Sequence, residues 1–177
     1  MIRSLPPWLR YLWLLLLPLS ASALPLGEGE FKAASVYNIL LFVQWPEGAL
    51  PADGTLRLCR IGTATPSTAF ARLAGRPIQQ RVLSVRTIEG TIKDVSQCDA
   101  LWVEADRMHA MARMAVLARQ HPLLLIGEGH DALEKGAMIG LSIDKGTARL
   151  WVDKIAAQGA GLNIGARLLQ LAVNTRP

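Results

Sequence analysis

Few side chains in this sequence have the types and spacing that catalysis requires. Glu104 and Asp106 directly follow the strand-like run Ala100–Val103, and open α/β sheets bind ligands beyond the carboxyl ends of their strands. Capping of the helix that follows is the simpler role for Asp106. The chain has no carboxylate pair placed persuasively for acid–base work and no G-x-S-x-G nucleophile motif. We therefore predict that the protein is not an enzyme and that it uses no cofactor.

The histidines do not form a metal-binding pattern. They are His109, His121 and His130. None has a second histidine four residues away, and neither cysteine has histidines at the spacing of a zinc site. We therefore predict that the chain binds no metal.

A glycine-rich segment, Gly127 to Ala132, nominally fits the dinucleotide-binding pattern G-x-G-x-x-A. That pattern belongs after the first strand of a fold and opens a long helix, whereas here Gly136 soon breaks the segment. Glu128 and Asp131 would also repel a pyrophosphate. The segment is therefore interpreted as a plain glycine-rich loop.

Two cysteines, Cys59 and Cys98, are the sequence's strongest covalent feature. Cys59 lies in the strand-like run Leu56–Ile61, and Cys98 precedes another such run, so two neighbouring strands could bring them together. In an oxidising compartment, an even number of cysteines favours a disulfide over free thiols. Closing a loop of about 40 residues stabilises the folded domain by roughly 4 kcal/mol in the chain-entropy model. Two buried free thiols and a metal pair are the alternatives.

The first 23 residues have the layout of a secretory signal peptide. Arg3 and Arg10 precede or flank the apolar run Tyr11–Leu19, and Ala21-Ser22-Ala23 supplies small residues for cleavage after Ala23. An uncleaved anchor is the alternative, but the apolar run is about half the length that spans a bilayer. We expect an exported protein with a single domain over residues 24–177 and no direct membrane insertion.

The charge of the expected mature chain excludes one class of partner. The full chain carries a net charge of +5, and loss of Arg3 and Arg10 lowers it to +3. The basic residues are scattered singly, without a Lys/Arg run or interleaved aromatic residues. We therefore predict no nucleic-acid partner.

The mature chain begins with an unusually apolar helix. Between Ala33 and Val43 only Ser35 and Asn38 are polar, and a helix that is apolar almost all round must be covered on most sides. Trp45-Pro46 is expected to end it. The part of this helix left exposed is our candidate partner or dimer interface, and its residues are Tyr37, Leu41 and Trp45.

The rest of the chain alternates strands and helices. The expected strands are 56–61, 78–87, 100–103, 122–126, 137–143 and 147–152, and the expected helices are 66–73, 106–120 and 164–173. Thr65 is expected to cap the helix at 66–73. This alternation predicts an α/β fold with a mostly parallel sheet of five to six strands and helices on both faces. Asp144-Lys145-Gly146 predicts an antiparallel hairpin near the C-terminus.

Several motifs resemble the YfiR-like family of periplasmic regulatory proteins. Residues 32–46 match the family signature K-A-A-x-x-Y-N-x-x-x-F-x-x-W-P at every fixed position. Residues 58–62, 73–78, 136–141 and 160–164 are similar to later family motifs, in the family's order. The family also has a cysteine pair at the places of Cys59 and Cys98.

The resemblance implies a function in the periplasm. The best understood members repress a membrane-bound diguanylate cyclase by holding its periplasmic sensing domain, which lowers cyclic di-GMP signalling and biofilm formation, and members form homodimers. An alternative is a periplasmic small-ligand-binding module that serves a two-component sensor kinase or a transporter. That alternative requires a pocket near the strand ends, around Gly62-Thr63 and Glu104-Ala105.

One segment departs from the family pattern. After the second hairpin strand the family has an aromatic residue, a Glu and then I-N-L, whereas this chain reads Leu150 to Lys154 with Asp153 and Lys154 at its end. The departure puts an identical choice of partner in doubt. Trp151 lies on the strand face opposite Leu150 and Val152, where it either packs on the sheet or serves as an exposed anchor for a partner.

Overall fold

The computed structural model of the protein describes residues 27–89 and 92–176. The predicted signal peptide, residues 1–23, lies outside the described residues, as does the start of the predicted domain 24–177. Within the described part, no helix combines the length and the apolar character needed to cross a membrane.

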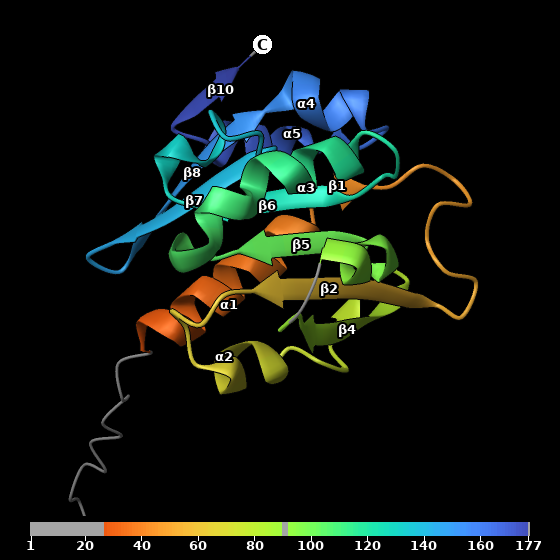
Figure 1. Ribbon diagram of the computed structural model, residues 1–177, viewed down its shortest axis with the longest axis horizontal. Helices are drawn as coiled ribbons and strands as arrows, with labels where there is room; N and C mark the ends of the chain where they lie inside the picture. Colours follow the sequence, from red (N-terminus) through yellow and green to blue (C-terminus); the bar gives the residue numbers. More distant parts are fainter. Residues whose placement is uncertain (1–26, 90–91, 177) are drawn as a thin grey trace, which may run out of the picture.

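The main sheet has eight strands in the order β10-β8-β7-β6-β5-β2-β4-β3 (Figure 1). Their bounds are β2 Thr55–Ile61, β3 Pro77–Ile78, β4 Arg81–Thr87, β5 Ala100–Val103, β6 Leu124–Glu128, β7 Ile139–Asp144, β8 Thr147–Asp153 and β10 Asn174–Arg176. The strands from β7 through β4 are parallel, while β7 and β8 form an antiparallel hairpin. The mostly parallel sheet with an antiparallel C-terminal hairpin is thus confirmed.

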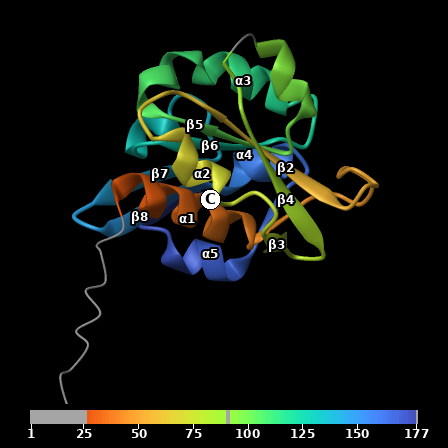
Figure 2. The same ribbon diagram turned by 90° about the horizontal axis from the view of Figure 1, so that it is seen from below.

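Helices cover both faces of the sheet, also as predicted. Figure 2 shows α3 (Met111–Ala118) on one face and both α1 (Glu28–Leu40) and α5 (Ala166–Leu171) on the other. α2 (Ser67–Ala71) packs against α1. Shorter helical segments connect the strands: η3 Ile92–Gln97, η4 Ala105–Ala110, η5 His130–Ala132 and α4 Lys154–Gly159.

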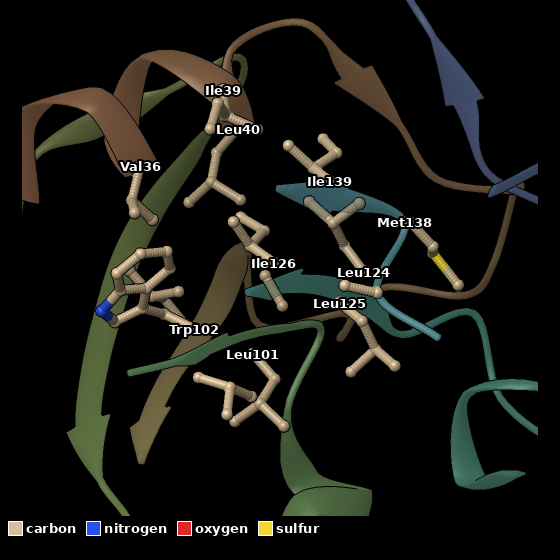
Figure 3. Packing of buried hydrophobic residues seen from close by; sticks show 14 of the residues in the cluster. Val36, Ile39, Leu40, Leu101, Trp102, Leu124, Leu125, Ile126, Met138 and Ile139 are labelled. Carbon is tan, nitrogen blue, oxygen red and sulfur yellow. The ribbon is translucent and has the colours of Figure 1, made fainter. Parts of the chain in front are cut away.

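The apolar first helix is covered by its own domain. Three of its side chains are almost fully buried: Val36, Ile39 and Leu40. Figure 3 shows Val36 and Leu40 pointing toward Trp102 and Ile126, whereas Leu101 and Leu125 point to the opposite face of the sheet. Because both faces are packed, every residue of β5 is buried, and the continuous apolar run in its sequence follows from that burial.

The sheet has more strands than the predicted five to six because short segments pair at its edges. The expected strand 78–87 turns sharply at Gln79, whose φ is 53°, and folds into an antiparallel β3–β4 pair. At the other edge, β10 pairs with β8. Strands of two or three residues carry too little periodicity to be recognised in a sequence.

The first helix ends earlier than predicted. It stops at Leu40 instead of at Trp45-Pro46, because Val43–Gln44 forms β1 and pairs antiparallel with β9, Asn163–Ile164. Pairing with a segment about 120 residues away therefore ends the helix before proline can.

Two other helices are shorter than predicted. The segment 106–120 divides into the 3-10 helix η4 and the α-helix α3. The predicted helix 164–173 loses Ile164 to β9 and narrows to α5.

Candidate functional site

β2 and β5 are adjacent parallel strands whose following segments diverge. The chain leaves β2 through α2 toward β4 at one side, and it leaves β5 through η4 and α3 toward β6 at the other. Such a point in an open α/β sheet leaves a crevice beyond the carboxyl ends of the strands, where ligands bind. The two loops approach closely here: a Cβ at Gly62, whose φ is +132°, would lie 2.5 Å from the Glu104 Cβ.

A buried ion pair joins the two loops. Arg60 at the end of β2 is 2% exposed and Glu104 after β5 is fully buried, with 3.1 Å between Nη2 and Oε1. The same Nη2 donates hydrogen bonds to the carbonyl oxygens of Gly62, at 2.9 Å, and Thr65, at 2.8 Å. The Thr65 backbone N–H donates to Glu104 Oε2 at 3.1 Å. The crevice is therefore organised around one buried arginine and one buried carboxylate.

Asp106 and Thr65 do not cap helices, contrary to the sequence-based predictions. Asp106 lies inside η4 and accepts hydrogen bonds from the backbone N–H and the hydroxyl of Thr63, both at 3.1 Å. Pro66 occupies the N-cap position of α2, and the Thr65 hydroxyl is buried without a partner. Loop-to-loop contact replaces local capping because the two loops meet only in the folded sheet.

Several buried polar atoms of the crevice lack hydrogen-bond partners within the described chain. They are Arg60 Nε, Arg60 Nη1, Thr65 Oγ1 and Glu104 Oε1. Glu104 Oε1 lies within ion-pair distance of Arg60, so its charge is balanced, but no donor is aligned with it. Each unsatisfied buried group costs about 1–3 kcal/mol, so this cluster is costly for stability.

A pocket of about 490 Å³ opens beside these atoms. Its polar lining includes Arg60, Thr63, Thr65, Ser67, Thr87, Glu89 and Arg107, and Gly62, Pro66 and Ile88 complete the lining. The sequence placed a candidate pocket around Gly62-Thr63 and Glu104-Ala105. Gly62 and Thr63 do line it, whereas Glu104 lies behind Arg60 and holds that side chain in position.

Lys32 lies in α1 and is the first residue of the signature motif at residues 32–46. It has a structural role that the sequence did not reveal. It is only 8% exposed and forms ion pairs with Glu28 at 2.7 Å and Glu128 at 2.6 Å. Burial lowers the pKa of Lys32, but its hydrogen bonds to Glu128 and Glu28 outweigh burial and raise the pKa above its ordinary value. Glu128 also accepts from the Ala105 backbone N–H at 2.9 Å, so α1 is tied to the crevice. The sequence feature that could have indicated this role is the presence of a lysine within an otherwise apolar helix.

The middle of β2 and the segment just before β5 are joined by a second, denser set of bonds. Cys59 and Cys98 form the predicted disulfide. Asp99, 4% exposed, accepts hydrogen bonds from Arg57 Nε at 3.1 Å, Arg57 Nη2 at 2.8 Å and the Arg57 backbone N–H at 2.7 Å. Hydrogen bonding to Asp99 raises the pKa of Arg57. Trp45 Nε1 donates to the Asp99 carbonyl at 3.1 Å, so the end of the signature motif also attaches here.

The three candidate interface residues of the first helix region differ in exposure. Leu41 is 37% exposed. Tyr37 is half-buried, its hydroxyl donates to the Pro77 carbonyl, and Arg76 lies over its ring at 5.5 Å. Trp45 is also half-buried, and its indole N–H is the donor to the Asp99 carbonyl described above. Leu41 thus has the largest exposed fraction of the three, and the interface remains a prediction.

Trp151 lies on the sheet face opposite the core side chains Leu150 and Val152, as the alternation predicts. It is half-buried, stands opposite Gly140 in the β7–β8 ladder and meets His130 edge-on at 5.9 Å between ring centroids. It therefore packs on the sheet while keeping an exposed portion. The Asp153 side chain accepts from the Ala156 N–H at 2.8 Å and caps α4, which gives the departure from the family pattern a local structural role.

A second, apolar pocket of about 230 Å³ lies between α1, β8 and α5. Its lining includes Ile39, Phe42, Leu150, Leu168 and Leu171. Across residues 27–89 and 92–176, no group of three or more histidine, cysteine or acidic side chains is arranged to hold a metal ion.

A family model for YfiR/HmsC-like proteins matches residues 29–173. The chain belongs to the YfiR/HmsC-like family. Members of this family are regulatory proteins. The search of curated proteins gave no match.

Two solved structures share the fold of this YfiR-like chain. A conserved domain protein from Vibrio cholerae O1 biovar El Tor is 16% identical with a TM-score of 0.52, over 85% of this chain and 61% of that one. The ABC domain in complex with L-Trp from Streptococcus pneumonia is 10% identical with a TM-score of 0.54, over 84% and 60%. The chain thus spans about three fifths of each structure, and these likenesses support the α/β fold alone.

Proposed function

We propose that this YfiR-like protein is a periplasmic repressor of a membrane-bound diguanylate cyclase. It binds the periplasmic sensing domain of the cyclase, stabilises its inactive state, and thereby lowers cyclic di-GMP signalling and biofilm formation. The observation that carries this proposal is the family match over residues 29–173. The disulfide between Cys59 and Cys98 supports it, because such bonds persist in oxidising compartments.

The energetic requirement for repression is differential affinity. A binding protein shifts a two-state receptor only by the difference between its affinities for the two states. About 5.5 kcal/mol moves the receptor from 1:99 to 99:1. A protein interface centred on a few well-packed apolar anchors can supply that amount, so no chemistry by the repressor is needed.

We place the partner or dimer contact at the candidate interface residues named from the sequence: Tyr37, Leu41, Trp45 and Trp151. Leu41 supplies the exposed apolar surface near the end of α1, at 37% exposure. Trp151 keeps part of its ring exposed on the other face. The residues lie on two faces of the sheet, so one face can serve a homodimer while the other contacts the receptor.

The proposal is tested with the chain from residue 24 to 177 and the purified periplasmic domain of a diguanylate cyclase from the same organism. We expect a stable complex by calorimetry, and raised cyclic di-GMP in cells that lack the chain. Leu41→Asp should abolish self-association or weaken the complex at least tenfold. Val116→Asp is the matched control, because Val116 is an exposed apolar residue of α3 on the opposite face, at 54% exposure. If folded Leu41→Asp sediments like the wild type and binds the cyclase domain with unchanged affinity, Leu41 is not part of the interface.

A small-ligand sensor module is the second candidate, and the pocket at the ends of β2 and β4 favours it. Such a module would report ligand occupancy to a two-component sensor kinase or a transporter. The neighbouring gene discriminates between the two candidates: a cyclase with a periplasmic sensing domain supports repression, whereas a sensor kinase or an outer-membrane receptor supports the sensor module.

A further inference from the structure

We propose that the pocket beside Arg60 binds a small organic carboxylate. The inference goes beyond the regulatory role proposed above and does not depend on the identity of any protein partner. It rests on unpartnered donors at the pocket wall, on the balance of charge there, and on the pocket's place in the sheet.

The first support is the set of donors without acceptors. Arg60 is 2% exposed and Thr65 is 3% exposed, both line the pocket, and Arg60 Nε, Arg60 Nη1 and Thr65 Oγ1 have no partner in the described chain. The Arg60 guanidinium lies over the Phe70 ring at 5.4 Å. That contact stabilises the charge through the face of the guanidinium, but the N–H bonds lie in its plane and still require acceptors.

The second support is the chemistry of the rest of the lining. Arg107 adds a second guanidinium, and Ser67 and Thr87 add hydroxyl groups. Donor groups therefore outnumber the one carboxylate of the lining, so the complementary ligand is a hydrogen-bond acceptor. Planar arginine donors suit carboxylate and phosphate oxygens.

Nearby acidic residues favour a carboxylate over a phosphate. Glu89 lines the pocket, and Glu104 and Asp106 lie directly behind it. Glu104 pairs with Arg60, and Asp106 lies 3.8 Å from Arg107, so together with Glu89 these carboxylates fully balance the two arginine charges. Repulsion therefore rises with the charge of the ligand, and a singly charged carboxylate fits better than a doubly charged phosphate.

The third support is size and position. A volume of about 490 Å³ falls within the range of small-molecule sites and far exceeds the roughly 30 Å³ of a single water molecule. Pro66 and Ile88 offer apolar contact to a short carbon chain. The pocket also adjoins the point where the connections of β2 and β5 diverge, which is where open α/β sheets bind ligands.

Calorimetry and thermal denaturation with defined probes test the proposal. The probes are the singly charged propionate, lactate and pyruvate, the uncharged propionamide and lactamide, and inorganic phosphate. To include carboxylates outside this panel, the protein is dialysed against the organic-acid fraction of a bacterial extract and the retained compounds are identified by mass spectrometry. The variants are Thr65→Val and Arg107→Gln, and Arg119→Gln is the matched control, an exposed arginine after α3 that does not line the pocket.

We expect at least one carboxylate, from the panel or the extract, to bind saturably with a dissociation constant below about 1 mM, and its amide to bind at least tenfold more weakly. Thr65→Val and Arg107→Gln should each weaken binding at least tenfold, while Arg119→Gln binds like the wild type. The proposal is overturned if the protein retains no carboxylate from either source, if phosphate binds as tightly, or if both pocket variants bind unchanged. Because the assay contains no cyclase, failure here leaves the repression proposal standing, and the reverse also holds.

Discussion

At the amino ends of β2 and β5, Asp99 accepts three hydrogen bonds from Arg57, whereas at their carboxyl ends Arg60 leaves two nitrogens without a partner. Both arginines sit on the same strand and both meet a buried carboxylate from the β5 segment. The disulfide of Cys59, in the middle of β2, adds to the Arg57 contacts, while a pocket adjoins Arg60. The same pair of strands therefore holds one buried carboxylate with several hydrogen bonds and one group of buried polar atoms that lack partners.

This difference separates structure from function within one strand pair. A satisfied buried polar group stabilises a fold, and an unsatisfied one costs free energy that only a further interaction can recover. The amino end accordingly serves stability. In our proposal, the carboxyl end retains a costly arrangement because ligand binding there benefits from preformed donors.

Removal of the disulfide should cause the largest loss of unfolding free energy. The double variant Cys59→Ala/Cys98→Ala should lose roughly 4 kcal/mol of unfolding free energy, because the closed loop of about 40 residues no longer restricts the unfolded chain. Urea denaturation measures the loss, and wild-type protein under reducing agent is the control. A loss below about 1 kcal/mol would show that the disulfide contributes little beside the Arg57–Asp99 contacts.

Asp99→Asn should cause the next largest loss of unfolding free energy. The substitution removes the charge that pairs with Arg57 and replaces one acceptor oxygen with a donor, at a site that is 4% exposed. We expect a loss of about 2 kcal/mol, since hydrogen bonds to charged buried groups are the stronger ones. Asp144→Asn is the control: its ion pair with Arg149 is half-exposed and should cost less than about 0.5 kcal/mol. Equal losses of unfolding free energy for both variants would contradict the larger contribution expected from the buried Arg57–Asp99 pair.

At the carboxyl end, Thr65→Val should not destabilise the protein. Valine has the shape of threonine without the hydroxyl, and that hydroxyl is buried without a partner. We expect the unfolding free energy to stay the same or rise by up to about 1 kcal/mol. Thr55→Val, at the amino end of β2, should instead lose about 0.5 kcal/mol, because Thr55 Oγ1 donates to Asp53 at 2.6 Å. A clear loss for Thr65→Val would mean that its hydroxyl is bonded in solution.

The smallest effect concerns the exposed partner of Lys32. Hydrogen bonding to Lys32 lowers the pKa of Glu28 below its ordinary value of 4.5. Its contribution is therefore present above pH 4.5 and lost as the pH falls through the lowered pKa. Because Glu28 is largely exposed, Glu28→Gln should cost only about 0.3 kcal/mol at pH 7. In denaturation curves, the difference in unfolding free energy between wild type and Glu28→Gln should shrink as the pH falls below 4.5. A difference that grows in acid would contradict a stabilising ion pair.

Parts of the candidate site could be read from the chain before folding. Cys59 and Cys98 indicated their bond through count and strand context, and Gly62, after a strand, indicated the edge where the pocket lies. Thr65 and Asp106 were misread as helix caps because a cap is a local contact, while their real surroundings come from another loop. Lys32 was missed because its partner Glu128 lies 96 residues away.

What the sequence by itself determined was the order of strands and helices, the apolar character of α1, and the family, because periodicity and motif spacing are local properties. Only the tertiary structure decided that Val43–Gln44 leaves the helix to pair with Asn163–Ile164. It alone decided that Arg57 bonds Asp99 through two side-chain nitrogens while two nitrogens of Arg60 lack a partner. The physical reason is that the partners of these groups come from β5, β9 and their loops, which adjoin β1 and β2 only after the sheet has formed.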